Sequence, residues 1–403
     1  MKTNISLPLG LPEFIILKQT IQETRILLEV ETIEPPNRCI HCGFSNLKRH
    51  DKRLRRVRDM NLFHKHLHLL IHVKRWRCQN CKEVFSEPLS SVPSGSHQTY
   101  RLQEHIFEQC RDTTISYVSR QLAMSYKTIE RIYYKMAKNE IQDEQTSGVV
   151  GIDEVAVRKG HRYETVVTDI IKGNVHEMGA DRDYQSALEI LERLEDRGLK
   201  TLVMDMWWPF HKAAKQLYPD IPIVIDKYHV VQKVNHAFDQ VRKAHNAQIK
   251  GLKKGRFALL KRPFRLTEKQ HQKLEEYHEE SPEIAHAYYL KEWFYDLYEQ
   301  STYEEAEAFL NTWIEQAKMS PFSAFHEYTK TLDTWKIHIL EYFRLPYTNA
   351  KTEGTNHKIK NRKRISYGFR NREHFRIRVK LECSQSNKEL HPSSASKSVV
   401  DVA

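Results

Sequence analysis

The chain has 403 residues, and its 64 Lys and Arg against 52 Asp and Glu give a formal charge of +12. This length allows several domains, and the positive charge favours a polyanionic partner such as nucleic acid. No run of about 18 apolar residues occurs, so the sequence predicts no membrane helix. The start of the chain carries Glu13 and only a short apolar stretch, so we expect no secretory signal and a soluble protein inside the cell.

Four of the six cysteines form two short pairs, Cys39-x-x-Cys42 and Cys78-x-x-Cys81. A CxxC turn presents both sulfurs to one ion, and two such turns complete the tetrahedral four-sulfur shell that structural Zn²⁺ favours. We therefore expect a structural zinc ion, with a redox-active or merely buried pair as the alternative. Nearby histidines are rival ligands that this shell does not require: His41, His64, His66, His68 and His72.

Helical periodicity runs from Tyr100 to about Ile141, with one break near Ala123. Residues 114–133 have the outline of a helix-turn-helix in which Ser125 caps the second helix. The shared core would consist of Val118, Leu122, Ile129 and Ile132. The side chains expected to face the DNA major groove are Lys127, Thr128 and Arg131. Plain helical packing is the alternative.

From Gly148 the pattern changes to that of a mixed α/β domain. Three stretches joined by short connections predict an antiparallel meander: 149–157, 163–171 and 175–179. Two apolar stretches, 201–204 and 221–225, predict buried parallel strands, each preceded by a helix (184–196 and 210–217). Several helices are expected over 230–343, and a final helix begins near Thr348 or Asn349.

Three acidic residues occupy positions where an acid is costly or functional. Asp153 lies inside the first predicted strand, and Asp205 ends the strand 201–204, where open α/β sheets collect functional groups. Glu353 lies early in the last helix. Together the three could hold two Mg²⁺ or Mn²⁺ ions at one sheet edge. Alone, they could be a strand-end hydrogen-bonding group, a helix N-cap and a solvated helix residue, respectively.

Several segments together resemble one known family. They are the paired CxxC module, Gly151–Glu154 with Arg158–Tyr163, Val203–Met206, Ile225–Val231, and Asn349–Asn356 followed by Lys358–Lys360. Over roughly residues 35–380 the chain resembles bacterial insertion-sequence transposases of the ISL-three type. The family has an RNase H-like catalytic domain with a DDE triad, and the resemblance implies that Asp153, Asp205 and Glu353 are this triad.

The implied fold is a multidomain α+β protein. Its expected parts are an N-terminal Cys₄ zinc module (1–92), a helix-turn-helix DNA-binding region (93–147), an RNase H-like mixed α/β catalytic domain (148–235 and 346–383), a large helical insertion (236–345) and a disordered tail (384–403). One assignment stays open, because Asp226 also lies in a family motif and could be the second acid. We favour Asp205, since it follows the fourth strand, and expect Asp226 and His229 to support the site.

The resemblance implies a DNA transposase that binds the terminal inverted repeats of its insertion sequence and catalyses metal-dependent strand cleavage and strand transfer. Backbone phosphates would be held by basic residues of the last helix: Lys358, Lys360, Arg362, Lys363 and Arg364. The expected partner is therefore double-stranded DNA, with no membrane involved. We also expect a homodimer or larger assembly, located at the nucleoid in a bacterial cytoplasm. A non-catalytic DNA-binding regulator and an RNase H-like nuclease or resolvase are the alternatives.

Overall fold

The computed structural model describes residues 9–141, 144–158 and 162–383. The predicted disordered tail lies outside these residues, as does the middle of the segment Arg158–Tyr163. The chain divides into two compact units, Met1–Glu140 and Ile141–Ala403. The first unit thus contains both the cysteine pairs and the predicted helix-turn-helix, and each unit is described by itself.

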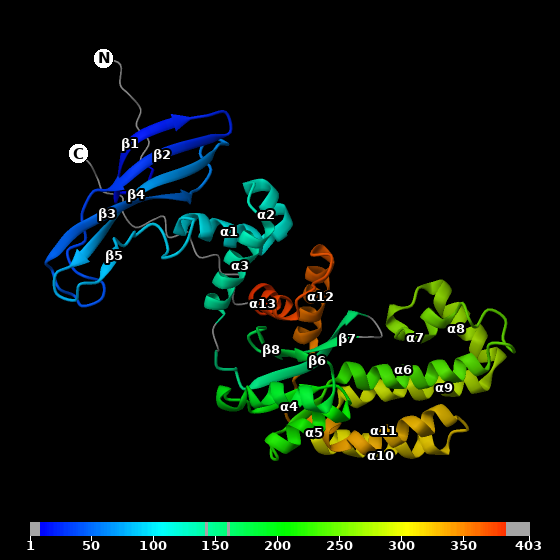
Figure 1. Cartoon of the computed structure of the whole chain (residues 1–403). Coiled ribbons are helices and arrows are strands. Elements are labelled where there is room, and N and C mark those ends of the chain that lie inside the picture. Colours follow the sequence, from blue (N-terminus) through cyan, green and yellow to red (C-terminus); the bar gives the residue numbers. More distant parts are fainter. Residues whose placement is uncertain (1–8, 142–143, 159–161, 384–403) are drawn as a thin grey trace, which may run out of the picture. The chain divides into compact units, whose positions relative to one another are not determined.

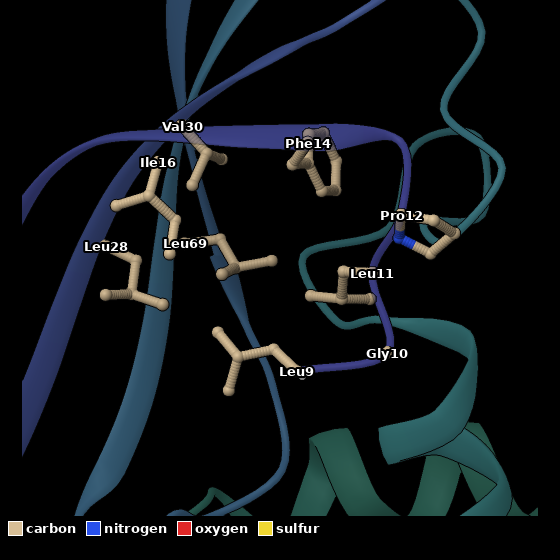
Figure 2. A pocket seen from close by; sticks show the side chains of 9 residues that line it. All are labelled: Leu9, Gly10, Leu11, Pro12, Phe14, Ile16, Leu28, Val30 and Leu69. Carbon is tan, nitrogen blue, oxygen red and sulfur yellow. The ribbon is translucent and has the colours of Figure 1, made fainter. Parts of the chain in front are cut away.

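The first unit begins with a five-stranded sheet in the order β1-β2-β4-β3, with β5 also paired to β4. Its strands are β1 (Phe14–Ile21), β2 (Arg25–Thr32), β3 (Leu47–Arg58), β4 (His66–Cys78) and β5 (Val84–Ser86). The alternating stretch that predicted a strand is the first part of β4, where Leu67, Leu69 and Ile71 are fully buried. Figure 2 shows side chains of the segment before β1 facing β2 and β4 across an apolar cavity of about 480 Å³.

Three helices complete the first unit: α1 (Tyr100–Asp112), α2 (Ile115–Leu122) and α3 (Tyr126–Glu140). The prediction of a single break in this region was incomplete, because the backbone also leaves the helix before Thr114, whose side chain caps α2. The second break follows Ala123, which has a left-handed backbone. Ser125 accepts a hydrogen bond from the Thr128 amide at 3.2 Å, as predicted for a cap. The four residues predicted as the shared core are all buried.

The second unit is built on a five-stranded mixed sheet in the order β10-β9-β6-β7-β8. Its strands are β6 (Val149–Arg158), β7 (Arg162–Asp169), β8 (Val175–Ala180), β9 (Thr201–Met204) and β10 (Ile223–Ile225). β6, β7 and β8 form the predicted antiparallel meander, and β9 and β10 run parallel to β6. The predicted mixed α/β fold, with its meander first and its parallel strands after it, is confirmed.

One face of this sheet is covered by α4 (Tyr184–Glu192) and α5 (Trp208–Leu217), and longer helices that share the same hydrophobic core extend beside them. The longer helices that contribute to this core are α6 (Lys227–Ala244), α9 (Pro282–Phe294), α10 (Tyr303–Met319) and α11 (Ser323–Leu340). The helices α7 (Arg256–Leu260) and α8 (Glu268–Glu280) lie between α6 and α9 in the chain. The insertion was predicted to begin at residue 236, but this residue lies inside α6, which starts directly after β10. The insertion therefore shares one hydrophobic core with the sheet.

The opposite face is covered by α12 (Ala350–Ile365) and α13 (Arg372–Cys383), which Figure 1 shows on the other side of the sheet from α4 and α5. The sequence predicted one final helix here. The structure has two, because Tyr367 and Gly368 adopt left-handed backbone conformations that end α12. Within the described residues, no helix is long and apolar enough to cross a membrane.

Asp169 fixes the turn between β7 and β8. Its buried carboxylate accepts hydrogen bonds from the amides of Ser147, Ile171 and Lys172 at 2.6–2.9 Å and from the Ser147 hydroxyl at 2.7 Å. Burial alone would raise the pKa of Asp169, but hydrogen bonds from His176, Lys172 and Ser147 outweigh burial and hold it well below its usual range. The ionised carboxylate is therefore a source of stability.

We expect Asp169→Asn to lower the free energy of unfolding by about 3 kcal/mol at neutral pH, because charge-assisted hydrogen bonds are lost in a buried site. The lowered pKa of Asp169 stabilises the folded state fully only above the pKa of an unfolded Asp, about 3.9. The difference in the free energy of unfolding between the variant and the wild type should therefore narrow as the pH falls below about 4. Urea titrations at two pH values measure this. Asp183→Asn is the control, because Asn caps α4 as well as Asp does; an equal loss in both variants would contradict the prediction.

Candidate functional site

Three aspartates lie in one row across neighbouring strands of the second sheet. Gly151 of β6 is paired with Val203 of β9, which is paired with Val224 of β10. Two residues further along each strand direction come Asp153, Asp205 and Asp226. Because side chains alternate between the faces of a sheet, residues two apart project from the same face. The three aspartates therefore belong to the face that α12 covers.

α12 is seated directly on β6, at a place where β6 has no side chain. A Cβ atom on Gly151 would lie 2.1 Å from Oδ1 of Asn349 and 2.5 Å from Oγ1 of Thr352. Asn349 also donates a hydrogen bond to the carbonyl oxygen of Ile152 at 3.4 Å. Glycine at position 151 thus allows the first turn of α12 to approach the strand, which brings Glu353 of the same turn to the row of aspartates.

Asp153 is held from two sides. Its Oδ1 accepts a hydrogen bond from the Glu154 amide at 2.7 Å, and its Oδ2 accepts one from the side-chain amide of Asn356 at 2.8 Å. Burial, reinforced by the charge of Asp205, raises the pKa of Asp153 to about 6 despite these bonds. The neighbouring Asp205 is thus close enough to oppose the ionisation of Asp153.

Asp205 lies at the end of β9 in a similar environment. Burial is the main cause that raises its pKa to about 6, while the nearby His229 acts in the opposite direction. Its Oδ1 is buried without a hydrogen-bond partner. The alternative role of Asp205 as a helix cap is not seen, because the N-cap of α5 is Trp207. A buried carboxylate oxygen that lacks a partner is expected where a cation binds.

Asp226, His229 and Glu353 form a compact group in which one ligand atom of each lies within 4.8 Å of the others. Asp226 and His229 come from the start of α6, and Asp226 is nearly fully buried without acting as a side-chain cap. This group does not include Asp153 or Asp205. His229 nevertheless acts electrostatically on both of them, so the predicted acids and the two supporting residues occupy one neighbourhood.

Two contributors were not foreseen from the sequence. Asn356 lies one turn after Glu353 on α12 and contacts Asp153 directly; an i, i+3 spacing from the predicted acid was the available signal. Arg182 forms an ion pair with Glu154 at 2.7 Å, and its guanidinium stacks over Tyr163 and Trp207. No local pattern links Arg182, Glu154, Tyr163 and Trp207, because they lie on four different segments that only the folded chain brings together.

The four cysteines of the first unit come together as the spacing predicts. Their sulfur atoms all lie within 4.8 Å of one another, with 3.7 Å between Cys39 and Cys81 and 3.6 Å between Cys42 and Cys78. A tetrahedral Zn²⁺ with Zn–S bonds of about 2.3 Å requires sulfurs about 3.8 Å apart. The donor set fits structural zinc.

The predicted DNA-contacting residues differ in their exposure to solvent. On α3, Lys127 and Arg131 are exposed and Thr128 is half-buried. On α12, Lys360 and Arg364 are exposed, whereas Lys363 donates to the carbonyl oxygens of Ala156 and Val157 at 3.0 and 2.7 Å. The remaining two are also engaged inside the unit, Arg362 with Glu382 at 2.7 Å and Lys358 with the carbonyl oxygen of Cys383 at 3.5 Å.

Comparisons with known proteins agree with this arrangement. A family model of the ISL3 DDE type, described as a transposase, matches residues 150–379. A zinc finger of the transposases IS204, IS1001, IS1096 and IS1165 matches residues 35–81, and the helix-turn-helix domain of transposase family ISL3 matches residues 87–135.

Two curated relatives are similar in sequence. The transposase for insertion sequence element IS1001 of Bordetella parapertussis is 27% identical over 362 residues, which is 85% of this chain and 87% of the relative. The transposase for insertion sequence element IS1557 of Mycobacterium tuberculosis is 26% identical over 255 residues, 55% of this chain and 56% of the relative. The first similarity extends through both units.

The contact of α12 with β6 predicts opposite effects for two glycines. Gly151→Ala should lower the free energy of unfolding by about 2 kcal/mol, because the added methyl group overlaps Asn349 and Thr352. Gly354→Ala on α12 has open space around the added Cβ and should raise it by about 0.5–1 kcal/mol through helix propensity. Thermal unfolding of both variants checks this. Equal stability of the two would show that α12 is not seated on β6 at this point.

Proposed function

Because this chain belongs to the ISL3 family of transposases, we propose that it binds the two ends of an insertion sequence and cuts and joins DNA there. The observation that carries the proposal is the row of Asp153, Asp205 and Asp226 under the helix that bears Glu353. Acids from separate segments meet at one face, and the helix that covers this face also carries the exposed Lys360 and Arg364. This is the composition that phosphodiester chemistry with divalent cations requires.

The donor set fits Mg²⁺ or Mn²⁺. Carboxylate oxygens are hard ligands that these ions prefer, and the partnerless Oδ1 of Asp205 is a buried acceptor of the kind that a cation satisfies. Asp153, Asp205 and Glu353 would hold the ions, with Asp226 as the alternative second acid and His229 as support. Ions bound there would supply charge stabilisation for the attacking and leaving oxygens of a phosphodiester.

The neighbouring residues have defined tasks in this proposal. Asn356 donates to Oδ2 of Asp153 and fixes the orientation of that carboxylate relative to Glu353 on the same helix. Two half-buried acids with raised pKa values repel each other when both are ionised, so the ionised pair is favourable only when positive charge is nearby. The exposed Lys360 and Arg364 continue along α12 and would bind backbone phosphates of the DNA held at the acids.

Recognition of the element ends is assigned to the first unit. The exposed Lys127 and Arg131, with Thr128, lie in the first turns of α3, the second helix of the helix-turn-helix, from which side chains reach base edges in the major groove. The Cys₄ cluster would hold structural Zn²⁺ and keep the sheet of this unit folded. Two ends must be joined in one reaction, so we propose a homodimer or larger assembly acting on DNA at the bacterial nucleoid.

We expect Asp153→Asn, Asp205→Asn and Glu353→Gln each to lower Mg²⁺-dependent cleavage of a duplex carrying the element's end by at least about a thousandfold, because each removes a charged ligand of the reacting centre. A gel assay with a labelled strand measures cleavage, and a second duplex as target measures strand transfer. Binding of the same duplex without Mg²⁺ should change less than about threefold, since binding is assigned to other residues.

Asp226→Asn decides which acid is the second ligand. If Asp205 has this role, Asp226→Asn should retain more activity than Asp205→Asn, and the reverse order would assign the role to Asp226. Full cleavage by both variants would contradict the proposed site. Cleavage without any strand transfer by the wild type would instead identify a nuclease or resolvase.

A further inference from the structure

A second candidate binding site lies between α4 and α5, and α5 begins three residues after Asp205 in the chain. It is a cavity of about 620 Å³, within the range of about 300–1,000 Å³ that holds small organic groups. Its lining consists of Tyr184, Trp208, Pro209, His211, Lys212 and Lys215. Among the described residues that line it, aromatic and basic side chains dominate and none is acidic.

Trp208 is the most unusual part of this lining, because 53% of its surface is exposed. Its ring is not loose: the centroid lies 4.6 Å from that of Trp335 with the planes 37° apart, and 5.1 Å from the edge-on ring of His211. The indole is thus supported by α11 and by its own helix while half of its surface stays open. A rigid, open aromatic surface is suited to stacking a planar group.

The wall formed by α5 carries a cation in addition to Trp208. The ammonium of Lys212 lies 5.0 Å from the ring centre of Tyr184, whose hydroxyl donates to Gln216. Lys215 is tied to the carbonyl oxygens of Pro219 and Ile221 at 2.9 and 3.0 Å. Lys212 is therefore the exposed cation of this wall, and a phosphate beside the cavity could pair with it at the expense of the weak contact with Tyr184.

The cavity is linked physically to the acids. Trp207, the residue before Trp208, donates its indole hydrogen to the carbonyl oxygen of Arg182 at 2.8 Å, and Arg182 pairs with Glu154 next to Asp153. Trp208 also follows Asp205 by three residues, so their Cα atoms are at most roughly 11 Å apart. At about 3.4 Å per nucleotide of a stacked strand, this is a reach of a few nucleotides from the acids.

We propose that this cavity binds one unstacked nucleobase of the DNA strand at the cleavage site, with Trp208 stacking on the base and Lys212 pairing with an adjacent phosphate. The inference rests on the proposed function, because it takes the acids to be the place where DNA is cut. Holding a base outside the helix opens the duplex end and fixes the scissile phosphate relative to the acids. Because every base has a π-face, such a site would tolerate any sequence.

The first test measures binding of a fluorescently labelled single strand of oligothymidylate to the full chain by anisotropy, without Mg²⁺. Trp208→Ala should weaken binding by about tenfold, the value expected for loss of one base–aromatic stack, while Trp208→Phe should keep most of the affinity. Tyr289→Ala is the matched control, because Tyr289 is also an exposed aromatic residue (60%) of the same unit. Equal binding by Trp208→Ala and the control would overturn the proposal.

The second test uses cleavage of the element-end duplex, intact or lacking one base next to the scissile bond. Trp208→Ala should cut the intact duplex about tenfold more slowly than the wild type. When the missing base is the one that Trp208 stacks on, the two proteins should cut the abasic duplex at about the same rate, because no base remains to be stacked. The same ratio on every duplex, or a changed oligomeric state of Trp208→Ala in light scattering, would show instead a structural role or a protein interface.

The two tests separate failure of this inference from failure of the proposed function. A wild-type chain that cuts the duplex while Trp208→Ala behaves like Tyr289→Ala in both tests keeps the function and loses the base site. A wild-type chain that binds oligothymidylate through Trp208 but cuts no duplex keeps the base site as a binding site and loses the function.

Discussion

The approach of α12 to β6 across Gly151 is the constraint on which the site depends. Asn356 and Asp153 are 203 positions apart in the chain, and all of the longer insertion helices lie between them. The chain leaves the sheet at β10, passes through these helices and returns as α12 on the opposite face. Any side chain at position 151 would meet Asn349 and Thr352, so a residue with no chemistry of its own allows Glu353 to reach the aspartates.

Electrostatic repulsion within the cluster is the reason why we interpret it as a candidate site and not as ordinary packing. Asp153 and Asp205 are both half-buried, and partial burial raises the pKa of each to about 6. A fold that needed these positions only for stability would gain by replacing the acids with apolar residues. By contrast, Asp169 at the far end of β7 is surrounded by donors that lower its pKa. Aspartate thus stabilises the fold at position 169, whereas in our proposal it binds a cation at positions 153 and 205.

Much of this arrangement could be predicted from sequence where the signal is local. The strand 201–204 and the CxxC pairs depend on short patterns, and the structure has both as expected. The break before Thr114 and the division of the last helix at Gly368 were missed, because each depends on one or two backbone conformations inside a helical pattern. Asn356 and Arg182 were missed because their partners lie on other segments, so only the folded chain brings them together.

The central claim is that Asp153, Asp205 and Glu353 hold divalent cations at one place on the sheet. Anomalous diffraction at the manganese edge, from crystals of the full chain with Mn²⁺ and element-end DNA, tests it most directly. We expect manganese peaks bounded by carboxylate oxygens of these three residues. A peak held by Asp226, His229 and Glu353 alone, with Asp153 and Asp205 away from any metal, would contradict the claim.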